Sequence, residues 1–238
     1  MIVFYITGTS SGIGKALAEE ALKIEDSLVY GFSRTNTIQN NRFKHTAVDL
    51  SDLAKVKQLY FEKHEDAYKV VLINNAGTIG DVKPLSRLSD NTLIDVFNLN
   101  SICPAILSSK ILKAYEGIDL SLVIVNISSG AGRHPIESWA PYCASKAAID
   151  MFSQVVQAEN GYDSKRIKVF SIAPGIVDTK MQETLRGSQP EDFPDLSKFI
   201  EYKKKGQLLT AEVVARKILE VVEKPEIHQN VLLDVRHL

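Results

Sequence analysis

The stretch TGTSSGIG at residues 7–14 stands between an apolar run at Ile2–Thr7 and an amphipathic run at residues 14–23. The apolar run predicts a buried strand, and the amphipathic run predicts a helix with one apolar face. Glycines permit a tight turn and a close approach of the backbone to a ligand. The start of the helix offers unpaired N–H groups and a positive dipole end to an anion. The stretch therefore predicts a strand, a turn and a helix that together hold a phosphate group.

The same alternation of apolar and amphipathic runs continues along the 238 residues. Parallel strands need long crossovers, and parallel strands buried on both faces are continuously apolar. The pattern predicts an α/β protein, with one Rossmann-like, doubly wound parallel sheet flanked by helices on both faces across residues 1–238. Further strands are expected at residues 28–33, 43–48, 70–73, 122–127, 169–173 and 231–235, and a helix at residues 53–64.

One segment has a different texture. Residues 187–205 contain two prolines, several acids and the run Lys203-Lys204-Lys205. We expect this segment to leave the sheet and to form a substrate lid at about residues 180–206. The three lysines are interpreted as a solvated helix face rather than a ligand site.

Composition narrows the classes of function. The formal net charge is -1, which gives no general attraction to nucleic acid or to anionic membranes. Cys103 and Cys143 show no metal-ligand spacing, so no metal is expected, and two reduced thiols suit the cytoplasm. The chain begins without a signal peptide, and it has no apolar run long enough to cross a bilayer. We therefore expect a cytoplasmic protein with neither a nucleic-acid partner nor a membrane partner.

A doubly wound sheet with such a phosphate-binding loop is typical of proteins that bind a dinucleotide, and the end of the second predicted strand indicates which dinucleotide this is. A site for NAD usually has a carboxylate there for the ribose hydroxyls. This chain has Ser33 and Arg34 instead, and a guanidinium group is a good partner for a 2′-phosphate. The alternative is that Arg34 is an ordinary surface arginine.

Several stretches in a fixed order resemble the short-chain dehydrogenase/reductase family. They are TGxxxGxG at residues 7–14, NNAG at 74–77, YxxxK at 142–146 and PGxVxT at 174–179. Ser129 precedes Tyr142 at the spacing found in the family, and Ser128 does not. Tyr142 and Lys146 are four residues apart, so they share one face of a helix. The resemblance covers residues 1–180 by motifs and the remainder in general layout.

The resemblance implies a catalytic set of Asn100, Ser129, Tyr142 and Lys146. Tyr142 would give a proton to a carbonyl oxygen, and Ser129 would hold the same oxygen. Lys146 would grip the nicotinamide ribose, and Asn100 would support a water relay to Lys146. The lysine ammonium and an oxidised nicotinamide are expected to lower the pKa of Tyr142 from its ordinary value near 10.

The resemblance also implies NADPH or NADP+ as the cofactor. Asp49 would meet the adenine edge, and Thr179 with the neighbouring backbone would fix the carboxamide. The expected cofactor-binding residues are Gly8, Ser10, Ser11, Gly12, Ile13, Gly14, Ser33, Arg34, Asp49, Leu50, Asn75, Ala76, Gly77, Tyr142, Lys146, Pro174, Gly175, Val177 and Thr179.

Within the family, residues 177–182, 191–194 and 206–210 look like the branch of sepiapterin and benzil reductases. That branch implies reduction of a ketone or a 1,2-diketone. His134, Trp139 and Met181 are candidates for the substrate pocket, although Trp139 is equally interpreted as a core residue and His134 as a surface residue.

The family forms dimers and tetramers through paired helices, and the helix after Tyr142 is rich in apolar residues. A homodimer or homotetramer is therefore expected, although a buried helix in a monomer would have the same composition.

Two other functions remain open. One is an NAD-linked alcohol dehydrogenase, against which Arg34 and the missing acid argue. The other is a dinucleotide-sensing protein that has kept the fold and lost the chemistry. The intact set of Asn100, Ser129, Tyr142 and Lys146 argues against that second alternative.

Overall fold

A computed structural model describes residues 1–238 and contains one parallel sheet of seven strands in the order β3-β2-β1-β4-β5-β6-β7. The strand order reverses between β1 and β4, and the carboxyl ends of these two strands form the crevice in which such sheets bind ligands. The predicted fold class is confirmed. The strands are β1 Ile2–Thr7, β2 Ser27–Ser33, β3 Phe43–Ala47, β4 Lys69–Asn74, β5 Ser121–Ile127, β6 Ile167–Ala173 and β7 Leu232–Asp234.

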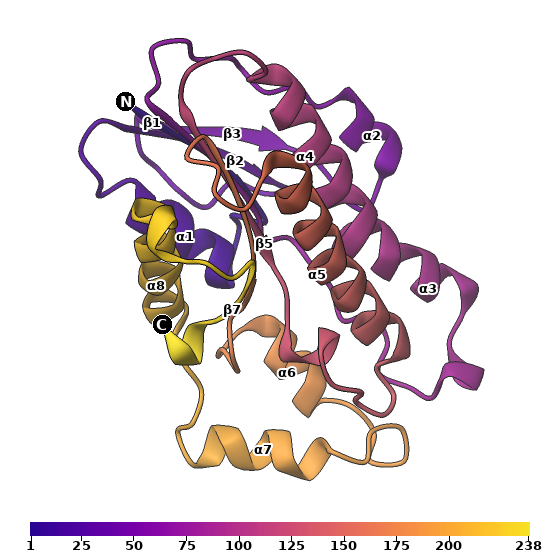
Figure 1. The fold of residues 1–238 in the computed structure, drawn as a ribbon. Coiled ribbons are helices and arrows are strands. Elements are labelled where there is room, and N and C mark those ends of the chain that lie inside the picture. Colours follow the sequence, from indigo (N-terminus) through magenta and orange to yellow (C-terminus); the bar gives the residue numbers. More distant parts are fainter.

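Helices cover both faces of the sheet (Figure 1). Helices α1 and α8 lie on one face, and α2, α4 and α5 lie on the other, while α6 and α7 extend beyond the carboxyl ends of the strands. The helices are α1 Gly12–Ala21, α2 Leu53–Gln58, α3 Asp90–Phe97, α4 Cys103–Ala114, α5 Ala140–Asn160, α6 Lys180–Arg186, α7 Leu196–Lys204 and α8 Ala211–Glu223. Short turns of helix lie at Leu85–Arg87, Asn98–Ile102, Gly130–Gly132, Pro225–Ile227 and Val235–His237.

Alternation along β1 divides the core into two layers. Phe4 and Ile6 join the apolar cluster under α1 and α8, whereas Val3 and Tyr5 join the cluster under α4 and α5. All four side chains are at most 1% exposed. Because successive side chains of a strand point to opposite faces, a strand covered on both faces must be apolar at every position.

The helix expected at residues 53–64 is wrong in length. Asp52 caps α2 by accepting hydrogen bonds from the N–H groups of Ala54 and Lys55, but the helix ends at residue 58. Leu59 then turns to an extended conformation, with φ -61° and ψ 139°. Tyr60, which had suggested a longer apolar face, is 80% exposed, and Phe61 reaches the core from the extended segment.

The segment at residues 180–206 folds as α6 and α7 with a connecting loop. Ion pairs fasten it to the rest of the protein. Arg87 contacts Asp192 at 2.6 Å, and Lys203 contacts Asp178. The segment also closes a third apolar cluster, which consists of Ile79, Val82, Ala131, Trp139, Tyr142, Leu185, Phe193, Leu196 and Phe199.

Two lysines of the run Lys203-Lys204-Lys205 form ion pairs in addition to facing solvent. Lys203 binds Asp178, and Lys205 pairs with Glu201 at 2.8 Å on the surface of α7.

None of the helices in the chain combines the length and the apolar character that crossing a bilayer requires.

Candidate functional site

The glycine-rich loop is closed tightly on its neighbours. Gly8 and Gly12 have φ values of +74° and +56°, a region that favours glycine. A Cβ atom on Gly14 would overlap both the carbonyl oxygen of Gly8 and the side-chain amide of Asn75. These glycines are therefore needed for the course of the backbone and for the contact between α1 and β4.

The start of α1 is open to an anion. Ser11 stands at the N-cap without a capping hydrogen bond from its side chain, and the first turn carries no acid. The first N–H groups of a helix have no partner inside the helix, and they carry the positive end of its dipole. Ser10 is half-buried and Ser11 is exposed beside these groups, with Ile13 half-buried one turn further on. The residues present thus suit a pyrophosphate.

Thr7 joins this loop to the end of β4, a role that the sequence did not indicate. Its hydroxyl oxygen accepts hydrogen bonds from the N–H groups of Asn75 and Ala76, each at 2.9 Å. The Asn75 amide donates to the Thr7 carbonyl oxygen at 3.0 Å. Gly77 follows directly, so the expected NNAG turn and the expected phosphate loop form one unit.

The candidate 2′-phosphate position combines an exposed cation with a buried hydroxyl. Arg34 is exposed, and Ser33 is buried. The Ser33 hydroxyl donates to the Thr35 carbonyl oxygen at 2.9 Å and lies 3.2 Å from the Thr9 hydroxyl and 3.0 Å from His45 Nε2. A phosphate would compete with these partners for Ser33, which leaves Arg34 as the freer ligand.

Asp49 and Leu50 follow β3 at the same edge of the sheet. Hydrogen bonds from the Ser51 hydroxyl at 2.7 Å and the Ser51 N–H at 3.0 Å lower the pKa of Asp49, and the charge of Arg34 lowers it further. Leu50 is buried. Asp49 is therefore an ionised acceptor close to Arg34 at the place expected for the adenine.

Tyr142 and Lys146 lie on the first turns of α5, and both are buried. Lys146 Nζ donates to the Ile127 carbonyl oxygen at 2.7 Å, at the end of β5. The same Nζ lies 5.7 Å from the centre of the Tyr142 ring. The predicted pair is therefore brought together beside the last residue of β5.

The expected lowering of the Tyr142 pKa relied on Lys146 together with an oxidised nicotinamide, and the net effect of the protein's own groups is in the opposite direction. Burial raises it to about 12, against a smaller lowering effect of hydrogen bonding with Ser129. Burial also lowers the pKa of Lys146 to about 8, so the ammonium is itself weakened, and Asp150 opposes that effect. Desolvation, which disfavours whichever form is charged, thus acts in the same sense on both groups.

Asn100 is placed by a π-helical turn at Asn98–Ile102, between α3 and α4. Its side-chain amide donates to the Thr78 carbonyl oxygen at 2.8 Å and to the Ser145 hydroxyl at 3.1 Å, and its oxygen accepts from the Thr78 N–H at 2.9 Å. A Cβ atom on Gly77 would lie 3.2 Å from Asn100 Oδ1 and 3.6 Å from Lys146 Nζ. Asn100 and Lys146 therefore flank the same glycine.

Ser129 begins the turn after β5, where its hydroxyl oxygen accepts from the Ala131 N–H at 3.1 Å. The side chain is half-buried. Ser128 is fully enclosed, and its hydroxyl has no hydrogen-bond partner within the protein. The structure thus places Ser129 beside Tyr142 and Ser128 in the interior, as the spacing had suggested.

The expected carboxamide-binding stretch follows β6. Pro174 is half-buried there, and Gly175 has a φ of +76°. Val177 is buried and forms an isolated parallel bridge with Leu209. Thr179 lies so close to Gly12 that a Cβ atom on this glycine would be 3.3 Å from the methyl group of Thr179. The stretch therefore meets the glycine-rich loop.

Aromatic residues form a wall beside Tyr142. The Trp139 ring lies edge-on to Tyr142 at 5.6 Å and stacks on Phe193 at 5.6 Å. The sulfur of Met181 lies 4.0 Å from the Tyr142 hydroxyl. Trp139 is thus a core residue that also borders the site, so its interpretation as a core residue and its interpretation as a pocket residue are compatible.

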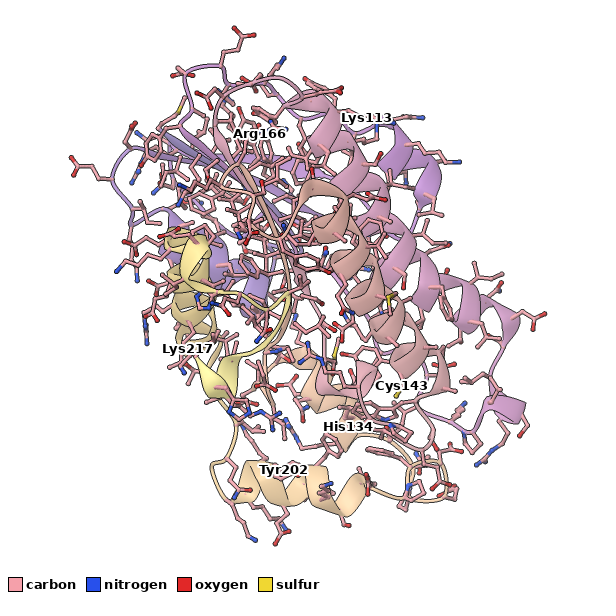
Figure 2. The ribbon with its side chains drawn as sticks, in the orientation of Figure 1. Lys113, His134, Cys143, Arg166, Tyr202 and Lys217 are labelled. Atoms are coloured by element: carbon pink, nitrogen blue, oxygen red, sulfur yellow. The ribbon has the colours of Figure 1, made fainter.

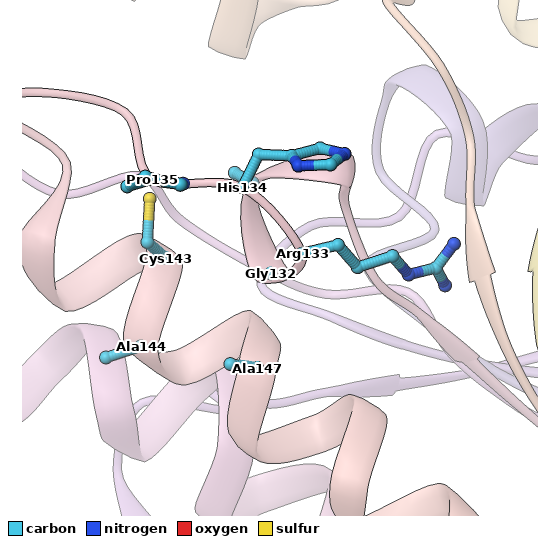
Figure 3. Close-up of a pocket in the computed structure, with 8 residues that line it drawn as sticks. Gly132, Arg133, His134, Pro135, Cys143, Ala144 and Ala147 are labelled. Carbon is cyan, nitrogen blue, oxygen red and sulfur yellow. The ribbon is translucent and has the colours of Figure 1, made fainter.

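His134 does not share this wall. It is exposed, and it lies near Cys143 at the start of α5 (Figure 2). Together with Cys143, Ala144 and Ala147 it lines an open cavity of about 320 Å³ (Figure 3). The interpretation of His134 as a surface residue fits this position better than a place in the substrate pocket. No group of three or more His, Cys, Asp or Glu side chains in the chain is arranged to hold a metal ion.

Comparison with known proteins agrees with this arrangement. The family model for short chain dehydrogenases matches residues 2–190. The chain therefore belongs to the short-chain dehydrogenase/reductase family of oxidoreductases, and the resemblance seen in the sequence is confirmed.

Individual relatives show which members of the family the chain is similar to. The chain is 33% identical over 243 residues to a benzil reductase ((S)-benzoin forming) of Bacillus cereus, with 97% of each chain covered. It is 32% identical over 246 residues to a sepiapterin reductase of Xenopus laevis, covering 93% of this chain and 90% of that one. A crystal structure of a short-chain dehydrogenase/reductase from Saccharomyces cerevisiae superimposes with a TM-score of 0.84 at 26% identity, covering 99% and 96%.

We expect Gly14→Ala to cost about 2 kcal/mol of unfolding free energy, because the new methyl group overlaps backbone that cannot move freely. The measurement is urea denaturation. Gly130→Ala is the matched control, because a Cβ atom at Gly130 meets nothing within 4 Å. Its effect should stay within about 0.5 kcal/mol. Equal stability of the two variants would show that the contact at Gly14 is not tight.

Proposed function

We propose that this protein is an NADPH-dependent carbonyl reductase that acts on a ketone or a 1,2-diketone. The observation that carries the proposal is the position of Tyr142 beside Ser129 and Lys146, at the mouth formed by β4 and β5 and the glycine-rich loop. Membership of an oxidoreductase family supports the type of reaction. Tyr142, placed beside Ser129 and Lys146, is the group that would serve as its acid.

Binding of the dinucleotide would begin at the glycine-rich loop. The open N-terminus of α1 suits the pyrophosphate, and Thr179 beside Gly12 suits the nicotinamide end. Arg34, exposed and close enough to Asp49 to lower its pKa, would receive the 2′-phosphate. The bound cofactor supplies the hydride, and the protein supplies position and protons.

Tyr142 would donate the proton to the carbonyl oxygen of the substrate. Because burial raises its pKa to about 12, the phenol keeps its proton at neutral pH, and a proton donor needs that form. Ser129 would donate a hydrogen bond to the same oxygen. Lys146, held by the Ile127 carbonyl oxygen, would grip the ribose and help to stabilise the phenolate left after proton transfer. Asn100 would support water beside Gly77.

The substrate wall favours an apolar, preferably aromatic, carbonyl compound. Trp139, Phe193 and Met181 present rings and a thioether to Tyr142. Relatives of this chain are named for reducing benzil and sepiapterin, both of which carry a ketone attached to a ring. Residues 180–206 would act as the lid of this site, because α6 and α7 close the cluster that contains Tyr142.

Two alternatives predict different behaviour. An NAD-linked alcohol dehydrogenase would prefer NADH, and a dinucleotide sensor would bind the cofactor without turnover. The first experiment follows the absorbance of NADPH and, separately, of NADH with benzil, an aliphatic 1,2-dione, a pterin ketone and a 3-oxoacyl thioester. Turnover of a dione or the pterin with NADPH supports the proposal. Tight binding of NADPH without turnover of any of them supports the sensor.

Tyr142→Phe should lower turnover at least about a hundredfold, because it removes the proton donor. The affinity for NADPH should stay nearly unchanged, since the phenol hydroxyl serves the reacting carbonyl group. Steady-state rates and a fluorescence titration of NADPH test the two halves separately. Turnover within about tenfold of the unmodified protein would remove Tyr142 from the acid role.

Arg34→Glu should weaken NADPH binding about 10- to 100-fold, the effect of losing a charge-assisted hydrogen bond, and should leave NADH binding much less affected. Isothermal titration with each cofactor measures this. Lys113→Glu is the matched control, because it makes the same change of charge at the opposite end of the sheet (Figure 2). Unchanged NADPH affinity in Arg34→Glu would contradict the assignment of the 2′-phosphate site.

We also propose that the protein is cytoplasmic, where its two unpaired cysteines stay reduced.

We propose further that two copies of the protein pair through α5. Along α5, the exposed positions are apolar up to its last turn. They are Ala140, Ala144, Ala147, Ala148, Met151, Val155 and Ala158. An exposed helix face without charges favours an interface, and a second copy brings the same face across a two-fold axis.

The double variant Met151→Glu with Val155→Glu should shift the protein from dimer to monomer. These side chains are 60% and 48% exposed, so their replacement puts charge in the interface without disturbing the core. Light scattering after size exclusion gives the mass. The control is Tyr60→Glu with Ile227→Glu, which replaces two exposed apolar side chains elsewhere. An unmodified protein that is already monomeric, or a control that dissociates equally, would contradict the proposal.

A further inference from the structure

An ion pair between buried Asp150 and half-buried Arg133 lies one helical turn beyond Lys146. Arg133 Nε donates to Asp150 Oδ2 at 3.0 Å, and the Ser171 hydroxyl donates to Asp150 Oδ1 at 2.6 Å. Asp150 is 5% exposed. Arg133 also donates to the carbonyl oxygens of Leu233, at 3.2 Å, and Ser171, at 3.4 Å. The network therefore joins the active-site helix α5 to β6 and β7.

Arg133 lines the neighbouring cavity, but its guanidinium group is committed to this network. Its side chain extends away from Cys143, Ala144 and Ala147 (Figure 3). Next to it, Gly132 packs so closely on α5 that a Cβ atom there would lie 2.7 Å from the carbonyl carbon of Lys146. The turn after β5 therefore places Ser129, which lies beside Tyr142, at its start, and Arg133, which binds Asp150, directly after it.

Lys146 and Asp150 are four residues apart on α5, so their side chains lie on the same face of the helix. Both are buried, and Lys146 Nζ donates to the Ile127 carbonyl oxygen. Burial lowers the pKa of the Lys146 ammonium to about 8, and the negative charge of Asp150 opposes that lowering. Hydrogen bonds from Arg133 and from the buried Ser171 hydroxyl fix the carboxylate in the position from which it acts.

We propose that Asp150, held by Arg133 and Ser171, is a positioning residue that keeps Lys146 in its charged form. The consequence for catalysis rests on the proposed function, in which a charged Lys146 stabilises the phenolate of Tyr142. Removal of Asp150 would leave the lysine to the effect of burial alone, which favours the neutral amine.

The other groups around Lys146 do not duplicate this charge. Tyr142 lies on the same helix, and burial raises its pKa to about 12, so it is neutral when Lys146 titrates. Asn100, across Gly77, does not titrate. Arg133 carries the opposite sign to Asp150, so it weakens the field of the carboxylate while fixing its position. Cys143 precedes Lys146 by less than one turn, and burial raises the pKa of its thiol.

The test is an NMR titration of Lys146 in protein labelled with 13C at the lysine Cε atoms. Lys146→Met assigns the signal by its loss. We expect Asp150→Asn to lower the titration midpoint by about one pH unit, at the low end of the effect of a nearby opposite charge. Ser171→Ala is the matched control, because it removes a hydrogen bond to the same carboxylate without changing any charge, and its midpoint should stay near that of the unmodified protein.

A midpoint in Asp150→Asn equal to that of the unmodified protein overturns the proposal. If Asp150→Asn does not fold, Asp150→Ser carries the test, because it also removes the negative charge, and a midpoint equal to that of the unmodified protein overturns the proposal. In the active enzyme, the alkaline limb of kcat for reduction should move in the same direction as the midpoint. The proposed function fails separately, if the unmodified protein reduces no carbonyl compound, and that result leaves the titration valid.

Discussion

The hydrogen bond from Lys146 Nζ to the carbonyl oxygen of Ile127 is the contact on which the site depends. It ties the first turns of α5 to the end of β5, and so it sets Tyr142 against Ser129. The sheet supplies the fixed side of this contact, because β5 is buried between β4 and β6. The close packing of Gly132 on the α5 backbone at Lys146 holds the other side. Rigid elements thus place the reacting groups, while the segment around α6 and α7 completes the surroundings.

Burial then decides which protons are present. It raises the pKa of Tyr142 to about 12 and lowers that of Lys146 to about 8, because the interior disfavours charge on either group. In this order of titration the phenol is protonated at neutral pH, and the lysine is still mostly charged. That state suits donation of a proton from Tyr142 more than abstraction of one. In the proposed function, this state fits reduction of a carbonyl group, and a positively charged nicotinamide would favour the opposite direction.

Much of this could be predicted from the sequence, because short-range rules govern it. The i, i+4 spacing placed Tyr142 and Lys146 on one face, and apolar runs predicted the strands. Long-range contacts were not accessible. Neither the link from Thr7 to Asn75 nor the ion pair of Arg133 and Asp150 follows from a local pattern. The helix expected after Asp52 was too long because apolar spacing does not show whether a side chain finds a partner. The raising effect of burial on the pKa of Tyr142 was not accessible either, because it depends on how the chain packs around the phenol.

The measurement that bears most directly on the central claim uses NADPH in which both hydrogens at C4 of the nicotinamide ring are deuterium. The protein is incubated with this cofactor and benzil in ordinary water, and the product is examined by mass spectrometry and proton NMR. The account predicts benzoin that carries deuterium on the carbinol carbon, with ordinary hydrogen on the oxygen, because the hydride comes from the cofactor and the proton from Tyr142 in exchange with water. Benzoin without deuterium at carbon would contradict direct hydride transfer, and consumption of neither compound would contradict the reductase assignment for this substrate.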